Sequence, residues 1–379
     1  MKKQFILLIV LLAAFCMQHL PAQNLAAKVD SGNISGADYK IVFPANWKGK
    51  LVMYAHGYEV KGLVPKNSKS PGFINALIPF LERGFAVAAS DYSTQGYAVV
   101  QGVDETEALR KYFVKNYGKP DTTFMVGHSM GGAIAIATME NFGKNYKGGL
   151  PLCPMDGPLY PFASNSFDFY ATCNAMFPGI EPPLSKIFAP NRMDSVKPMT
   201  PGSMFSRLNE IKKRIIGKDS AVALAYCKRL DLKLDDLPFK IFFSELVLRD
   251  YAEKAKGNPF DNTNTIYSGF PDNREINKKV ERLTATVDPI DFFKTYDRTG
   301  NINQPIVLMH TLYDQLISPS VVVDFENIVK AQRKLQNLTI HYTNGQGHCA
   351  FTPQQTAQAF DELRAWANTG KKPNAGPIE

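Results

Sequence analysis

Short apolar runs recur along the chain, and within each run hydrophobicity is nearly continuous rather than alternating with polar positions. This pattern is typical of strands that helices cover on both faces of a sheet. Before the first run, residues 25–49 predict a short β lead-in with a polar turn at 31–36. We expect strands at 51–57, 85–92, 122–129, 148–155, 305–312 and 338–344.

Helix-like segments separate several of these runs. Residues 73–84 end on a glycine, which favours helix termination. Residues 102–118 carry acids early and bases late, in agreement with the helix dipole, and residues 321–335 predict another helix. Strands that alternate with helices predict an α/β fold with a mostly parallel central sheet flanked by helices.

The alternation of strands and helices is interrupted between the apolar run at 148–155 and the one at 305–312. Residues 158–302 contain no strand of comparable quality and hold aromatic-rich and helix-like stretches instead. So long a segment is not a plain loop in a compact domain. We therefore expect a mainly helical cap insertion at 158–302, and an α/β core formed by 24–157 and 303–379. The helix-like stretches of the cap are 177–188, 205–217 and 238–257.

The N-terminus predicts export. Two lysines precede an apolar run at 5–15, and a polar and small stretch follows at 18–24. This order is typical of a secretory signal peptide, and the apolar run is too short to span a membrane. We expect a signal peptide at 1–23, a periplasmic or extracellular protein and no stable membrane anchor.

Composition excludes several classes of protein. Of the 379 residues, 45% are hydrophobic and 21% are charged, which is typical of a globular chain and excludes a disordered or fibrous one. The formal net charge is +8, but the lysines and arginines are scattered. Without a block of like charges we expect no nucleic-acid partner. The oligomeric state does not follow from the sequence.

The sharpest chemical signal is GHSMGG at 127–132. It matches G-x-S-x-G and lies between a strand-like and a helix-compatible segment, where a tight turn would expose the Ser129 hydroxyl above the sheet. In this setting a chance match is the weaker interpretation. We therefore expect Ser129 to be a nucleophile.

A serine hydroxyl is a poor nucleophile at neutral pH and needs a base. His348 is the histidine that follows the last predicted strand, in a glycine-rich turn that could bring its imidazole over the sheet. It also satisfies the chain order of serine, acid and histidine. The alternative is a histidine with a purely structural role.

The acid that orients the histidine should follow the penultimate strand. Asp314 lies just past the apolar run at 305–312 and is our prediction. Its carboxylate would accept the imidazole N–H and stabilise the imidazolium. Asp156, one strand earlier, is the alternative.

An oxyanion that develops during acyl transfer needs hydrogen-bond donors. One donor should be the main-chain amide of Met130, the residue after the nucleophile. The second should come from the HGYE loop at 56–59, and we assign it to the main-chain amide of Tyr58, with the Tyr58 hydroxyl as the alternative.

Together these residues resemble the α/β-hydrolase superfamily, in the branch of exported bacterial esterases and lipases and related serine peptidases. The motifs that carry the resemblance are GHSMGG, HGY, the Asp314 loop and QGHCAF, and it covers roughly 50–157 and 303–367. The resemblance implies the α/β-hydrolase fold and a serine hydrolase activity. Two departures limit a subfamily assignment: the HG motif lacks the extra glycines of HGGG esterases, and Cys349 follows His348.

Four cysteines follow the signal peptide: Cys153, Cys173, Cys227 and Cys349. An even number in an exported protein permits two disulfides in any of three pairings, and buried free thiols are the alternative. The histidines lack His-x-x-x-His spacing, and neither Cys-x-x-Cys nor a phosphate-binding loop with its lysine occurs. We expect neither a metal nor a cofactor.

Hydrolysis of carboxylic esters is the function that these residues favour, through an acyl-enzyme on Ser129. The first alternative is a prolyl-oligopeptidase-like serine peptidase, in which a cap acid such as Glu245 would bind an amino terminus. The second is a non-catalytic binding protein that kept the fold, against which the complete serine, histidine and aspartate set argues. The substrate would be a small-molecule or polymer-linked ester. Phe167 and Tyr170 are candidate substrate-binding residues, unless they only pack the cap on the sheet.

Overall fold

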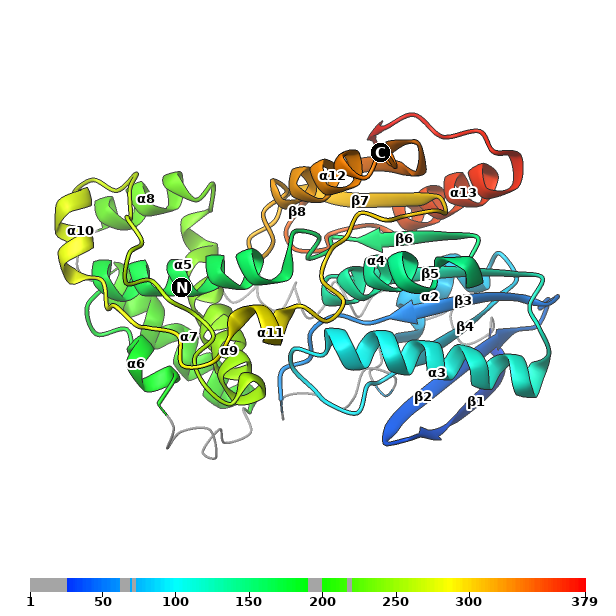
Figure 1. The fold of residues 1–379 in the computed structure, drawn as a ribbon, viewed down its shortest axis with the longest axis horizontal. Coiled ribbons are helices and arrows are strands. Elements are labelled where there is room, and N and C mark those ends of the chain that lie inside the picture. Colours follow the sequence, from blue (N-terminus) through cyan, green and yellow to red (C-terminus); the bar gives the residue numbers. More distant parts are fainter. Residues whose placement is uncertain (1–25, 62–68, 70–72, 190–199, 217–219) are drawn as a thin grey trace, which may run out of the picture.

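A mostly parallel sheet of nine strands forms the centre of the protein (Figure 1). The computed structural model describes residues 26–61, 69, 73–189, 200–216 and 220–379, so the predicted signal peptide at 1–23 lies outside the described residues. The strands lie in the order β1-β2-β4-β3-β5-β6-β7-β8-β9. Their bounds are β1 Ala26–Ile34, β2 Ala37–Pro44, β3 Lys50–Ala55, β4 Phe85–Ser90, β5 Thr122–His128, β6 Gly148–Leu152, β7 Ile306–Tyr313, β8 Leu338–Gln346 and β9 Gly376–Pro377.

The first two strands form an antiparallel hairpin, and β2 also pairs antiparallel with β4, whereas all later neighbours are parallel. The hairpin turns at Ser35 and Gly36, whose φ angles are 52° and 95°. The expected turn at 31–36 is therefore too long, since Ser31 pairs with Lys40 and remains in the strand. Polar side chains suggested a turn there because β1 is a largely exposed edge strand.

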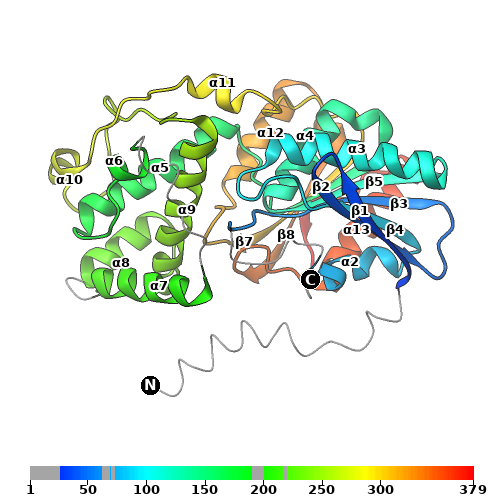
Figure 2. The ribbon, with the colours of Figure 1, turned by 90° about the horizontal axis from the view of Figure 1, so that it is seen from below.

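Helices cover both faces of the sheet (Figure 2). The alternating side chains of β3 show why the apolar runs are continuous: Leu51 and Met53 enter one core, whereas Val52 and Tyr54 enter the other. All four are buried, so each face of the strand needs apolar residues. The first core lies under α3 (Val99–Tyr117), α4 (Met130–Phe142) and α12 (Val321–Ala331), and the second under α2 (Phe73–Leu81) and α13 (Pro353–Thr369).

Between β6 and β7, the part of the chain that the structure describes forms helices and no strand. This helical insertion lies beside the sheet, at the left of Figure 1. The stretch expected to be helical at 177–188 is an α-helix only at α6, because Pro182 and Pro183 interrupt it. The α-helices of the insertion are α5 Leu159–Met176, α6 Leu184–Ile187, α7 Pro201–Ile216, α8 Ser220–Arg229, α9 Leu237–Ala255, α10 Asn273–Lys279 and α11 Pro289–Phe293.

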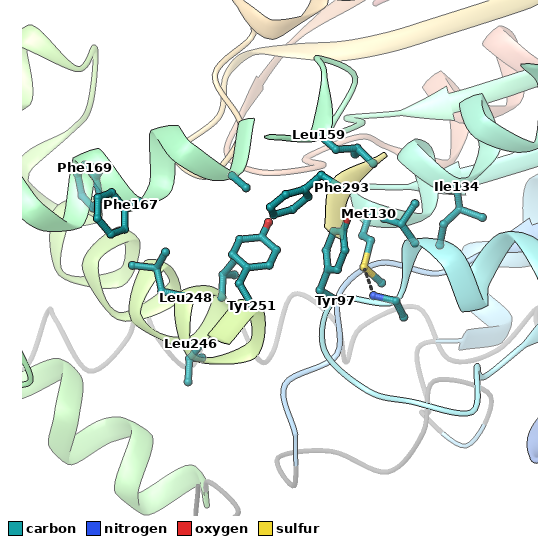
Figure 3. Close-up of a cluster of buried hydrophobic side chains, with 14 of the residues drawn as sticks. Tyr97, Met130, Ile134, Leu159, Phe167, Phe169, Leu246, Leu248, Tyr251 and Phe293 are labelled. Carbon is teal, nitrogen blue, oxygen red and sulfur yellow. Dashed lines mark hydrogen bonds between the residues drawn. The ribbon is translucent and has the colours of Figure 1, made fainter. Parts of the chain in front are cut away.

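The insertion, called the cap below, shares an apolar core with the sheet domain (Figure 3). Tyr97, from the loop before α3, packs with its ring centroid 5.1 Å from that of Tyr251 on α9 and 6.0 Å from that of Phe293 on α11. The adjacent Ala98 amide donates to Met130 Sδ over 3.3 Å. Buried aromatic contacts of this kind fix the cap over the start of α4.

The aromatic cluster under α13 should be essential for stability. Phe360 is fully buried, with ring centroids 4.9 Å from Phe80, 5.2 Å from Phe85 and 5.4 Å from Phe124. We expect Phe360→Ala to lower the free energy of unfolding by about 3–5 kcal/mol, because it leaves a cavity among these rings. Phe205→Ala on α7, where the side chain is 48% exposed, should change it by less than about 0.5 kcal/mol. Denaturant unfolding of both variants measures the difference, and equal losses would contradict this core.

Candidate active site

Ser129 occupies a strained turn between β5 and α4. Its φ of 58° and ψ of −122° are rare for a residue with a side chain. Its amide donates to the Leu152 carbonyl over 2.9 Å, and its carbonyl accepts from Ala133 over 3.1 Å. The main chain is thus held from both sides while the hydroxyl points away from the sheet.

The glycines of the motif are required by close main-chain packing. A Cβ at Gly127 would lie 2.0 Å from the Gly131 carbonyl oxygen, and a Cβ at Gly131 would lie 2.1 Å from the Ala55 carbonyl oxygen. Real Cβ atoms do not approach main-chain oxygens so closely. The spacing G-x-S-x-G therefore follows from the packing of α4 against β3 and β5.

The structure brings Ser129, His348 and Asp314 together from three separate segments. His348 Nε2 lies 2.8 Å from Ser129 Oγ, and His348 Nδ1 lies 2.7 Å from Asp314 Oδ2. Both distances are those of good hydrogen bonds. In this arrangement Nδ1 carries the proton donated to Asp314, and Nε2 is free to accept the serine proton.

The Asp314 carboxylate is held in place by the loop after β7. Its Oδ1 accepts hydrogen bonds from the amides of Leu316 and Ile317, both over 2.8 Å. Burial acts to raise the pKa of Asp314, but His348 and these two amides outweigh burial and lower the pKa below its usual value. Asp314 is therefore ionised at neutral pH, as a group that stabilises an imidazolium must be.

Further contacts fix the loop that carries His348. The His348 amide donates to Gln315 Oε1 over 2.9 Å, and the next residue, Cys349, forms a disulfide with Cys153. Cys153 directly follows β6, so the disulfide ties the histidine loop to the middle of the sheet. Neither contact was predicted, since the spacing of the cysteines left all pairings open.

The four cysteines therefore form one disulfide instead of two. Cys173 and Cys227 are buried free thiols in the cap. Cys173 Sγ donates to the Tyr226 hydroxyl over 3.2 Å. Cys153, His348 and Cys349 are the cluster in the described residues with metal-ligand spacing, but both sulfurs belong to the disulfide and the imidazole bonds to Ser129 and Asp314.

Asp156, the alternative acid, lies fully buried in the loop after β6. Burial raises its pKa to about 8, although the charge of Arg298 acts in the opposite direction. A carboxyl group that is protonated at neutral pH cannot stabilise an imidazolium. Together with the hydrogen bond between His348 and Asp314, this favours Asp314 as the orienting acid.

Both residues assigned to an oxyanion hole line the cavity above Ser129. The Met130 amide belongs to the first turn of α4, where main-chain amides have no partner within the helix. Gly57 packs closely on Ser129, because a Cβ at Gly57 would lie 3.3 Å from Ser129 Cβ, and Tyr58 follows it. The Tyr58 ring packs edge-on to Phe243 of α9, with centroids 5.4 Å apart, which favours its amide over its hydroxyl as donor.

A cavity of about 450 Å³ lies between the cap and the sheet domain, with Ser129 and His348 in its wall. Its lining is rich in aromatic and hydroxyl groups, as is typical of sites for small organic ligands. α9 contributes Lys240, Phe243, Ser244, Val247 and Tyr251, and α5 contributes Phe162, Asn165, Ser166, Asp168, Phe169 and Thr172.

Phe167 and Tyr170, the candidate substrate-binding residues, do not line this cavity. Phe167 packs between Phe188 and Phe260 inside the cap, and the Tyr170 hydroxyl donates to the Pro182 carbonyl over 2.9 Å. The reason is helical periodicity: the lining positions of α5 recur at intervals of three and four, whereas these two residues lie on the opposite face. The neighbouring Phe169 lines the cavity instead.

No protein-family model matches the chain, and no curated protein is similar to it in sequence. In structure it is similar to an esterase of Pyrococcus furiosus, with TM-score 0.47, 15% identity, and 93% of this chain and 96% of that chain covered. Feruloyl esterase B from Aspergillus oryzae gives TM-score 0.47, 13% identity, and coverages of 91% and 81%. Acylaminoacyl peptidase from Pyrococcus horikoshii gives TM-score 0.44 and 9% identity, with 94% of this chain and 43% of that chain covered.

The fold is evident from the chain itself. A mostly parallel sheet, helices on both of its faces and the strained Ser129 turn between β5 and α4 give the protein the α/β-hydrolase fold expected from its sequence. In the described residues, no helix is both long and apolar enough to cross a membrane.

The two aspartates can be separated by isosteric substitution. We expect Asp314→Asn to lower kcat for an ester substrate by about 10⁴-fold, because an amide donor facing Nδ1 selects the wrong imidazole tautomer. Asp156→Asn should cost less than about tenfold, since that carboxyl group is already neutral at pH 7. Unchanged melting temperatures would exclude misfolding. The reverse order of losses would place the acid after β6.

The disulfide should position His348. We expect Cys153→Ala/Cys349→Ala to lower kcat by about 10- to 100-fold, because small displacements of a catalytic base are costly. The free energy of unfolding should also fall, by about 2–5 kcal/mol. The matched control is Cys173→Ala/Cys227→Ala, which removes the two free thiols and should leave kcat within about threefold of the wild type. Equal kcat values for the two double variants would contradict a positioning role.

Proposed function

We propose that the protein is a secreted serine hydrolase that cleaves carboxylic esters. The observation that carries this proposal is the hydrogen-bonded chain from Ser129 Oγ through the His348 imidazole to the buried Asp314 carboxylate. It opens into a cavity of the size that small organic ligands occupy.

In the first half of the reaction, Ser129 Oγ attacks the carbonyl carbon of the ester while its proton passes to His348 Nε2. The negative charge that develops on the carbonyl oxygen is stabilised by the main-chain amides of Met130 and Tyr58. As the tetrahedral intermediate collapses, the C–O bond to the alcohol breaks and His348 returns the proton to the leaving oxygen. An acyl group remains on Ser129.

In the second half, His348 takes a proton from a water molecule, whose oxygen attacks the acyl carbon. The same donors stabilise the second oxyanion. Collapse of this intermediate releases the carboxylic acid and restores the Ser129 hydroxyl. The ionised Asp314 stabilises the imidazolium in both halves.

The cavity and the cap favour a small ester over a peptide. Glu245, the acid considered for binding an amino terminus, receives hydrogen bonds from Arg207 at 3.0 and 3.2 Å and from Arg249 at 2.8 and 3.0 Å. Both of its oxygens are therefore occupied within the cap, and it is not among the residues that line the cavity. This removes the residue on which the peptidase alternative relied.

The disulfide supports export. Disulfides persist in oxidising compartments outside the cytoplasm, and the Cys153–Cys349 bond lies beside the proposed catalytic histidine. Together with the lysines and apolar run at the N-terminus, it favours an exported esterase in the periplasm or outside the cell.

The proposed chemistry can be tested at Ser129. A fluorophosphonate probe should label the wild type but not Ser129→Ala, and this variant should lose about 10⁴- to 10⁶-fold in kcat on 4-nitrophenyl butyrate. The loss follows because the acyl intermediate forms on Ser129 Oγ, which the substitution removes. Serine substitution at Cys227, a buried thiol outside the cavity, serves as a labelling control and should leave the probe reaction intact.

Two outcomes would contradict the proposal. Labelling that persists in Ser129→Ala would place the nucleophile elsewhere. Rapid cleavage of an aminoacyl 4-nitroanilide with little cleavage of esters would instead favour the peptidase alternative.

A further inference from the structure

A lysine of the cap reaches the loop that holds the proposed catalytic acid. Lys240 lies near the start of α9, and its Nζ donates to the carbonyl oxygens of Gln315 and Leu316, over 3.0 and 3.3 Å. These residues directly follow Asp314, and the Gln315 side chain in turn accepts from the His348 amide. Lys240 also lines the cavity whose wall contains Ser129 and His348.

The charge of Lys240 is not matched by a carboxylate. The ion pairs of the described residues do not include Lys240, and both of its hydrogen-bond acceptors are neutral main-chain carbonyls. The nearby Asp314 carboxylate is already occupied by His348 and two amides. An ammonium group has three N–H donors, so one remains after these two bonds.

The surroundings of Lys240 make this charge costly. Burial lowers the pKa of Lys240, although the charge of Asp314 acts against this effect. Its Nζ also lies 5.3 Å from the centre of the Phe169 ring, which lines the cavity as well. An anion bound in the cavity would accept a hydrogen bond from the third N–H and compensate a charge that burial destabilises.

The other charged residues of the cavity wall are less suited to this task. Arg229 is exposed, donates to the Ser268 carbonyl and stacks on Phe270, so water weakens its attraction for an anion. Asp168 would repel an anion and already accepts a hydrogen bond from Tyr267 over 2.6 Å. Lys240 is thus the lining cation that is less exposed to water than Arg229 and that contacts the Asp314 loop directly.

We propose that Lys240 binds a carboxylate of the substrate, so that the preferred substrates are esters carrying a free carboxylate in the acyl or the alcohol part. A single remaining donor suits one carboxylate oxygen, whereas a phosphate dianion calls for several donors. This proposal rests on the proposed esterase function and names the substrate class of the same site. Lys240 then selects the substrate, while Ser129, His348 and Asp314 carry the reaction.

The test compares esters that differ only by the carboxylate. On the acyl side, 4-nitrophenyl monoadipate and monosuberate are compared with 4-nitrophenyl hexanoate and octanoate. On the alcohol side, 4-carboxyphenyl acetate is compared with phenyl acetate. We expect the wild type to favour the acidic member of at least one pair. Lys240→Met should lower the ratio of kcat/KM, acidic to neutral, by about 10- to 100-fold, and Lys240→Arg should restore part of it.

The matched control is Lys213→Met on α7, an exposed lysine that does not line the cavity. It removes the same charge from the protein and should leave the ratio unchanged. Equal losses on acidic and neutral esters in Lys240→Met would mean that the lysine only supports the Asp314 loop, and this result would overturn the proposal. A wild type that disfavours the acidic member of every pair would overturn it too.

A binding measurement separates this proposal from the esterase function. Calorimetric titration of adipate into Ser129→Ala and into Ser129→Ala/Lys240→Met requires no turnover. We expect the second protein to bind adipate about 10- to 100-fold more weakly. If no ester is cleaved but this difference is found, the function fails and the carboxylate site stands. If neutral esters are cleaved but adipate binds both proteins alike or neither, the function stands and the carboxylate site fails.

Discussion

The strained turn at Ser129 is the constraint on which the rest of the site depends. Its φ of 58° persists because β5 and α4 meet with main chains so close that Gly127 and Gly131 cannot carry a side chain. A turn of this kind fixes the hydroxyl at one point above the sheet. Every other group of the site must therefore be brought to that point.

The sheet positions Asp314, whereas long-range contacts position His348. Asp314 follows β7 directly and is fixed by amides of its own loop, whereas His348 lies in a turn after β8 that local structure alone does not fix. That turn is restrained by the Asp314 carboxylate, by the Gln315 side chain, by hydrogen bonds of Gly347 to β7 and by the Cys153–Cys349 disulfide. His348 is thus positioned by residues distant from it in sequence, which agrees with a preorganised site.

The cap forms one wall of the cavity above Ser129. Its helices α5 and α9 present aromatic and hydroxyl groups toward Ser129, and Tyr97, Tyr251 and Phe293 join the cap to the core of the sheet domain (Figure 3). α9 contributes both to this packing and to the cavity wall. The position of the cap on the sheet domain therefore determines which side chains face Ser129. Lys240 extends the coupling to the Asp314 loop.

The sequence by itself determined the α/β fold, the buried strands and the three residues that meet at the Ser129 turn. Continuous apolar runs indicate strands buried on both faces, and the G-x-S-x-G motif with the order of serine, acid and histidine indicates the three residues. Only tertiary structure decided the Cys153–Cys349 pairing and the burial of Asp156, which depend on neighbours far away in the chain. The helical period of α5 could be predicted from the sequence, but not which of its faces would point toward Ser129. Phe167 was therefore a candidate, whereas Phe169 is the residue that lines the cavity. Lys240 belongs to no sequence motif. Its proposed role depends on the Gln315 and Leu316 carbonyls, which only folding brings beside it.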